Sequence, residues 1–118
     1  GFEFSENYGR YLENIIYLEL LRRQADNQKQ KIYFWKDIQH HEVDFVIKEK
    51  NTVKQLIQVA WELSDPKIQQ REKKNLLKAM AEFNLKEGLI ITGDTSGEEK
   101  IDNKKIIIMP ASQWLLNA

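Results

Sequence analysis

Two segments whose polarity alternates residue by residue lie next to each other in the middle of the chain, at residues 42–48 and 53–63. Alternation with a period of two is typical of a β-strand with one buried face. The short turn Lys50-Asn51-Thr52 between them predicts an antiparallel hairpin. The β-rich run KIYFW at residues 31–35 precedes both segments. We therefore expect an antiparallel meander of three strands at the centre of the fold.

A helix is predicted on each side of this meander. Residues 6–24 carry apolar side chains at helical spacing, with Ser5 as the expected N-cap. The apolar band is wide, which favours burial on more than one side of this helix. Asp65 and Pro66 are a strong start for a second helix, because aspartate caps free N–H groups and proline suits the first helical position. This helix is expected to end near Asn84.

The remaining segments complete a mixed sheet. Leu89–Thr92 reads as a buried strand that runs parallel to residues 53–63, because the intervening helix is a crossover connection. Asp102-Asn103-Lys104 separates two apolar runs and predicts a hairpin. Residues 112–116 predict a short terminal helix that places Trp114 on the core. The order helix, three strands, helix, strand, hairpin and terminal helix predicts an α/β (α+β) fold.

Composition limits the classes of function. The chain has 118 residues, which suits a single domain, and its 0 cysteines exclude a disulfide scaffold or a cysteine-built metal site. The 18 Lys+Arg balance the 18 Asp+Glu, whereas a dedicated nucleic-acid-binding protein usually has a basic surplus. We read the basic runs at Lys29–Lys31 and Arg71–Lys74 as solvated faces. No apolar run is long enough to span a bilayer and no secretory leader is visible, so we expect a cytoplasmic protein without membrane partners.

Two acidic residues depart from the usual placement of charge. Glu13 has apolar neighbours at helical spacing; it either pairs with Arg10, accepts a hydrogen bond, or binds a metal ion. Asp44 lies inside a predicted strand, where aspartate is disfavoured. Alternation places Asp44 opposite the face that carries Val43 and Phe45. It is either part of a polar outer face or a metal ligand.

These residues lie within a broader resemblance. Glu13 in YLENIIYLELLRR, Asp44 in EVDFVI and the strand QLIQVAWEL resemble the PD-(D/E)XK nuclease fold. More narrowly, nearly the whole chain resembles the uncharacterised C-terminal domain of prokaryotic AAA-type ATPases, including LSDP, KEGLIIT and PASQWLL. The resemblance implies that residues 1–118 are the C-terminal part of a longer ATPase. The chain itself has no GxxxxGK[ST] motif and so no ATPase domain.

The resemblance also implies a site, and the chain departs from it. An intact site holds Mg²⁺ with a helix carboxylate, a strand carboxylate and a Glu, while a Lys two residues further orients the attacking water. Glu13 and Asp44 match the first two positions and are the candidate metal ligands. Gln58 replaces the third acid, and Ala60 replaces the lysine. A neutral carbonyl is a weaker ligand for a hard cation, and alanine cannot orient water.

Other residues are weaker candidates for a functional site. Glu62 shares the predicted face of Gln58, and a lysine from the second helix is a conceivable substitute for the missing one; the candidates are Lys73, Lys74 and Lys78. His40 and His41 are adjacent, so their side chains are expected to diverge in a turn rather than share a metal. The three tryptophans are expected to pack in the core rather than stack on bases; they are Trp35, Trp61 and Trp114.

Three functions remain open. The first is a catalytically degenerate nuclease-like domain that recognises a partner or target, or regulates an ATPase, through its own N-terminal ATPase domain or another protein; it needs no cofactor. The second is an active Mg²⁺-dependent DNA or RNA nuclease with a rearranged site. The third is a nucleic-acid-binding module without catalytic activity, which the zero net charge disfavours.

Overall fold

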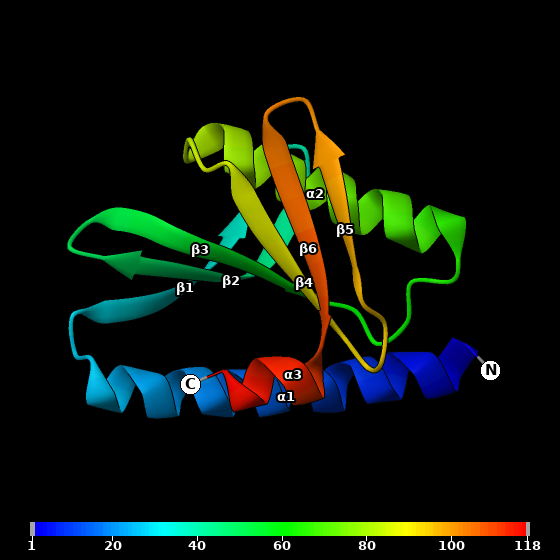
Figure 1. The fold of residues 1–118 in the computed structure, drawn as a ribbon, viewed down its shortest axis with the longest axis horizontal. Coiled ribbons are helices and arrows are strands. Elements are labelled where there is room, and N and C mark those ends of the chain that lie inside the picture. Colours follow the sequence, from blue (N-terminus) through cyan, green and yellow to red (C-terminus); the bar gives the residue numbers. More distant parts are fainter. Residues whose placement is uncertain (1, 118) are drawn as a thin grey trace.

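The computed structural model describes the backbone of residues 2–117 and the side chains of residues 7–117. It is an α+β structure in which three helices flank one six-stranded sheet (Figure 1). The elements in chain order are α1 (Phe2–Asp26), β1 (Gln30–Lys36), β2 (Glu42–Glu49), β3 (Thr52–Val59), α2 (Pro66–Glu82), β4 (Glu87–Thr92), β5 (Gly97–Ile101), β6 (Lys104–Pro110) and α3 (Ala111–Leu116).

The strands lie in the order β1-β2-β3-β4-β6-β5. The predicted meander is confirmed, because β1, β2 and β3 pair antiparallel. The predicted crossover is also confirmed, because β4 pairs parallel to β3. Beyond it, β6 pairs parallel to β4 and antiparallel to β5, as expected of a C-terminal hairpin. The sheet is therefore mixed, and its two edges are β1 and β5.

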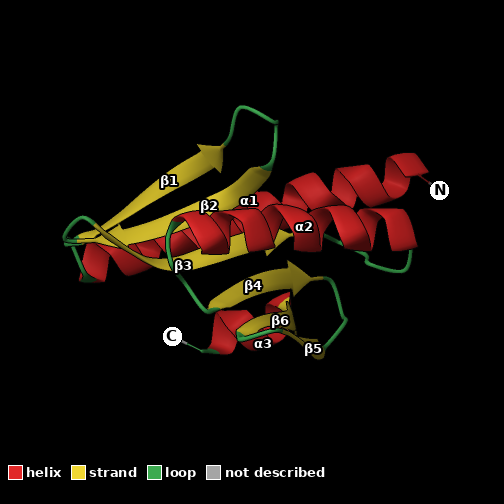
Figure 2. Ribbon diagram, turned by 90° about the horizontal axis from the view of Figure 1, so that it is seen from above, coloured by secondary structure: helices red, strands yellow, loops and turns green. Residues whose placement is uncertain are grey.

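The core has two apolar layers, one on each face of the sheet. The helices α1 and α3 lie below the strands in Figure 1, and Figure 2 shows the same elements from above. Both layers receive side chains from β3 and β4, because neighbouring residues of a strand point to opposite faces of the sheet. Leu56 and Ile90 pack toward α2, whereas Ile57 and Ile91 pack toward α1 and α3. Trp114 of α3 is buried in the second layer, as predicted.

The helix α1 differs from prediction at its start and in its burial. It begins at Phe2, so Ser5 lies within the helix and the predicted N-cap is wrong. Burial on more than one side is also wrong, because among the described side chains of α1, from residue 7 on, the buried apolar residues form one stripe; it consists of Leu12, Ile16 and Leu20. The opposite side leaves large apolar residues exposed, among them Tyr11 at 65%, Ile15 at 47% and Leu18 at 65%.

The start of α2 matches the prediction. The Asp65 carboxylate accepts the N–H of Lys67 at 2.9 Å, and Pro66 is the first helical residue. The helix ends at Glu82, just before the expected Asn84. The turn after β5 places Asp102 at a positive φ of 55°, a conformation that aspartate tolerates in tight hairpins. None of the helices in the described range 2–117 is long and apolar enough to cross a membrane.

The predicted strand at residues 53–63 is too long, since β3 ends at Val59. The paired register of β2 and β3 ends at Phe45 opposite Ile57. Past this pair, β3 keeps backbone contact only with the β4 side, where the N–H of Ala60 donates to the carbonyl of Ile91 at 2.9 Å. The strand β3 therefore ends near the point where its pairing with β2 stops.

Candidate functional site

A β-bulge in β2 determines the direction of Asp44. Tyr33 lies opposite Val46 and Trp35 opposite Val43, so β2 has one more residue than β1 between the two pairs. The bulge moves Val43 onto the α2 side of the sheet, whereas Phe45 packs on the α1 side. The prediction that these two residues share a face is therefore wrong. Bulges commonly redirect one side chain, and here the redirected side chain is Asp44.

Side chains continue the connection between β2 and β3 where the backbone pairing stops. The Gln58 Oε1 accepts the N–H of Asp44 at 2.9 Å, and the Gln58 Nε2 donates to the carbonyl of Glu42 at 2.8 Å. In return, the Asp44 Oδ2 accepts the N–H of Val59 at 2.8 Å. Two of the sequence-predicted site residues thus join the strands through three side-chain hydrogen bonds.

The role of Gln58 here is structural. Its side chain is only 2% exposed, and its amide nitrogen and oxygen both bond to the backbone of β2. An ionised carboxylate accepts hydrogen bonds but cannot donate one to the carbonyl of Glu42. Glutamine at this position therefore satisfies a backbone group that glutamate would leave without a donor.

The electrostatics of Asp44 show which acids surround it. The pKa of Asp44 is raised to about 7, mainly by burial and also by the charges of Glu13, Glu72 and Glu42, against the lowering effect of the Val59 N–H. Burial also raises the pKa of Glu13. The helix α1 thus brings Glu13 close enough to act on Asp44, as the resemblance implies. Glu13 is exposed and, among the described residues, forms no ion pair with Arg10.

The sequence interpretation missed Glu72. Burial raises the pKa of Glu72; the neighbouring Arg71 lowers it, at 3.5 Å between charged atoms, and the charges of Glu13 and Glu42 raise it. Its side chain is 14% exposed. Spacing contains the missed signal, because Glu72 lies one turn from both Ile68 and Leu76 on the face of α2 that packs on the sheet.

Ala60 and the substitutes for the missing lysine do not complete a catalytic set. Ala60 is buried in the apolar layer under α2. Lys73 forms an ion pair with Glu99 of β5, and Lys74 and Lys78 line a groove between α2 and β5. Glu62 accepts a hydrogen bond from the Ser64 hydroxyl. Within the described part of the chain, no three His, Cys, Asp or Glu residues are arranged to hold a metal ion.

The histidines serve the turn between β1 and β2. The Nδ1 of His41 lies 2.7 Å from the Asp37 Oδ2, and His40 has a positive φ of 67°. The other carboxylate oxygen of Asp37 accepts the N–H groups of Gln39 and His41. The turn position of the two histidines agrees with the prediction.

Trp61 is not a core residue, contrary to prediction. It is 36% exposed and stacks on Tyr8 with ring centroids 4.9 Å apart. It also lines a cavity of about 590 Å³ near the carboxyl ends of β3 and β4. Gly93 approaches its ring so closely that an added Cβ would lie 3.0 Å from it. Trp61 is therefore held between α1 and the end of β4, where its carbonyl also accepts the N–H of Gly93 at 3.0 Å.

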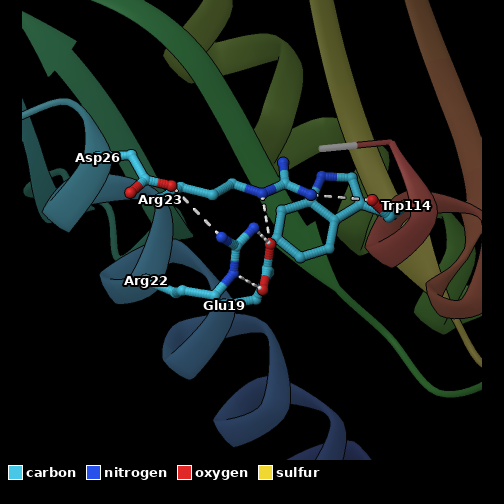
Figure 3. Close-up of polar contacts among 5 residues, drawn as sticks. All are labelled: Glu19, Arg22, Arg23, Asp26 and Trp114. Atoms are coloured by element: carbon cyan, nitrogen blue, oxygen red, sulfur yellow. Dashed lines mark hydrogen bonds and ion pairs between the residues drawn. The ribbon is translucent and has the colours of Figure 1, made fainter.

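A polar cluster fixes the C-terminal half of α1 against α3 (Figure 3). The guanidinium of Arg23 lies over the ring of Trp114, 4.1 Å from its centroid, and donates to the Trp114 carbonyl at 3.0 Å. Glu19 accepts hydrogen bonds from Arg22 and Arg23, which together hold the pKa of Glu19 at about 2. Arg22 also pairs with Asp26. This cluster anchors the helix that carries Glu13.

Comparison with known proteins places the chain in a family. Residues 8–114 match the family described as "Domain of unknown function (DUF4143)". The chain is 40% identical over 122 aligned positions to an uncharacterized protein, MJ1544, of Methanocaldococcus jannaschii. This alignment covers 96% of the chain but only 26% of the relative, so the chain spans about a quarter of that protein's length. No solved structure matches the chain. Because the family match covers most of the sequence, the chain belongs to the DUF4143 family of domains of unknown function.

Proposed function

We propose that this domain is a catalytically degenerate, nuclease-like domain that recognises a partner or target for a prokaryotic ATPase, or regulates it. In this account the domain has the PD-(D/E)XK architecture and retains the positions of the catalytic residues. Its partner is the ATPase domain of the same polypeptide or another protein. The much greater length of the archaeal relative supports a module within a larger protein.

The observation that carries this proposal is the use of Gln58. The residue at the third acidic position is buried, and its amide oxygen and nitrogen both form hydrogen bonds to the backbone of β2. Ala60, at the lysine position, is buried among apolar side chains. These structural roles support a site that has lost its catalytic chemistry. Removal of one member of a catalytic unit usually removes most of the activity.

The exposed face of α1 supports a protein partner. Tyr11, Ile15 and Leu18 lie within two turns of one another and are each about half exposed or more. Contiguous apolar surface of this kind marks interaction sites on proteins. We assign this face to contact with the ATPase, because α1 is otherwise covered on one side only.

The partner role is tested by chemical crosslinking of the full-length natural protein and of its Leu18→Glu variant, a change on the exposed face of α1; Gln39→Glu, at an exposed residue between β1 and β2, is the control for added charge. In the natural protein we expect crosslinks between α1 and a P-loop ATPase region. We expect Leu18→Glu to abolish these crosslinks. Crosslinks that persist in this variant contradict the assignment of the α1 face.

The alternative, an active Mg²⁺-dependent nuclease, is favoured by one observation. Asp44, Glu13 and Glu72 come from three different elements; the charges of Glu13 and Glu72 raise the pKa of Asp44, and the charge of Glu13 raises the pKa of Glu72. A divalent cation would relieve this repulsion. If the site binds Mg²⁺, the melting temperature rises with Mg²⁺ concentration by mass action, and Asp44→Asn abolishes the rise. We expect the melting temperature to be the same with Mg²⁺ and with an equal ionic strength of NaCl.

A further inference from the structure

A groove between α2 and β5 shares no residue with the Asp44–Gln58 site. Its volume is about 410 Å³, and its lining includes Lys73, Lys74, Leu77 and Lys78 from α2. Ile101 of β5 faces Leu77 across it, and both pack partly buried against the apolar layer under α2. The groove therefore has an apolar floor with lysines along one wall.

The opposite wall is an open sheet edge. Within residues 2–117, β5 pairs with β6 and with no other strand. In an antiparallel pair, only alternate residues turn their N–H and C=O groups toward the neighbouring strand. The other backbone groups of β5 point outward, and such an edge can accept a strand from another chain.

The charge of the groove indicates what kind of partner binds in it. Lys73 is neutralised by Glu99 on β5. Lys74 and Lys78 are exposed and form no ion pair among the described residues. The groove thus presents two uncompensated positive charges in a chain whose formal net charge is zero. Carboxylates complement these charges, and the open backbone edge requires a peptide rather than a nucleic acid.

We propose that the groove binds an acidic peptide segment of a partner protein, which adds to β5 as a further strand. One apolar side chain of the peptide packs on Leu77 and Ile101, and flanking carboxylates on the same face contact Lys74 and Lys78. This inference names a second surface and the chemistry of its partner. It goes beyond the function proposed above and does not depend on the loss of nuclease activity.

The test uses the complete chain and the peptide acetyl-TETVTET-amide, whose Glu, Val and Glu share one face of a strand. Two control peptides are acetyl-TKTVTKT-amide and a form of the first that is N-methylated at every residue, so that no residue keeps a backbone N–H to donate to the edge. Binding is measured by fluorescence anisotropy, and its location by backbone amide NMR shifts. We expect shifts at Gly97–Ile101 and an affinity at least about tenfold lower for both control peptides.

Matched variants test whether the charges of Lys74 and Lys78 contribute to peptide binding. Lys74→Glu with Lys78→Glu is expected to weaken binding at least about tenfold. Lys29→Glu with Lys31→Glu makes the same change in net charge near the other sheet edge and is expected to leave binding unchanged; circular dichroism confirms the fold of each variant. No binding at millimolar peptide, or equal binding of the N-methylated peptide, overturns the proposal. A single-stranded oligonucleotide that binds these residues more tightly than the peptide also overturns it.

Discussion

Asp44 and Gln58 each bond to the backbone of the other's strand. Gln58 accepts the N–H of Asp44, and Asp44 accepts the N–H of Val59 next to Gln58. This reciprocal arrangement replaces the backbone pairing that ends at Phe45 and Ile57. Its members are two positions that the nuclease resemblance assigns to metal binding. The same side chains thus connect β2 to β3.

Gln58→Glu is expected to destabilise the domain by about 1–3 kcal/mol, although it restores the acid of the nuclease pattern. The substitution leaves the buried carbonyl of Glu42 without its donor and adds a carboxylate beside Asp44. Urea unfolding at pH 7 measures the change. Gln55→Glu is the control, because Gln55 is an exposed residue of the same strand. Equal stability of the two variants contradicts the structural role of Gln58.

The pH dependence of stability is expected to report on Asp44. Its folded-state pKa of about 7 lies above the ordinary value of 3.8, so the folded protein retains a proton that the unfolded chain releases. The free energy of unfolding therefore falls as pH rises from about 4 to about 7, by up to about 4 kcal/mol from this group. Asp44→Asn keeps an oxygen for the Val59 N–H and does not titrate. We expect a shallower pH slope in this variant by urea unfolding at pH 5–8; identical slopes contradict the shift.

Removing a neighbouring charge is expected to lower the pKa of Asp44. Glu13→Gln and Glu72→Gln each remove one negative charge that raises it. Both variants are expected to be neutral or more stable near pH 7, since the remaining acids repel less. NMR titration of the Asp44 side-chain carboxyl carbon measures the shift. Glu87→Gln, at a side chain 60% exposed at the start of β4, is the control and is expected to leave the pKa of Asp44 unchanged.

Two glycines are expected to respond in opposite directions to alanine. A Cβ at Gly93 would lie 3.0 Å from the Trp61 ring, whereas a Cβ at Gly9 meets nothing within 4 Å. Gly9→Ala is expected to stabilise α1 by about 0.5–1 kcal/mol. Gly93→Ala is expected to displace Trp61 from Tyr8 and lower the melting temperature. A rise in melting temperature with Gly93→Ala contradicts the close packing of Trp61.

Most of the fold could be predicted from the sequence, because local patterns determine it. Three local signals each specify one element or connection, and all three are confirmed. They are the alternation at residues 42–48 for a strand, Asp65 before Pro66 for a helix start, and the crossover to Leu89–Thr92 for a parallel strand. The β2 bulge could not be predicted, because it depends on the register with β1 rather than on residues within β2. The early end of β3 depends in the same way on the partner that it loses.

The candidate site was predicted less completely. Asp44 and Gln58 are brought together, and Glu13 acts on Asp44, at positions the resemblance identifies. The bonds of Gln58 to the β2 backbone were not visible in the sequence, since they need two strands at a known separation. Glu72 lies outside the positions that the resemblance identifies, and its burial depends on how α2 packs on the sheet.

Nucleic-acid cleavage tests the central claim most directly. Labelled single- and double-stranded DNA and RNA are incubated with the domain in Mg²⁺ or Mn²⁺, beside Glu13→Ala and Asp44→Ala. The account predicts no metal-dependent cleavage above the level of either variant. Metal-dependent cleavage by the natural sequence that both substitutions eliminate would contradict the degenerate site and establish a nuclease.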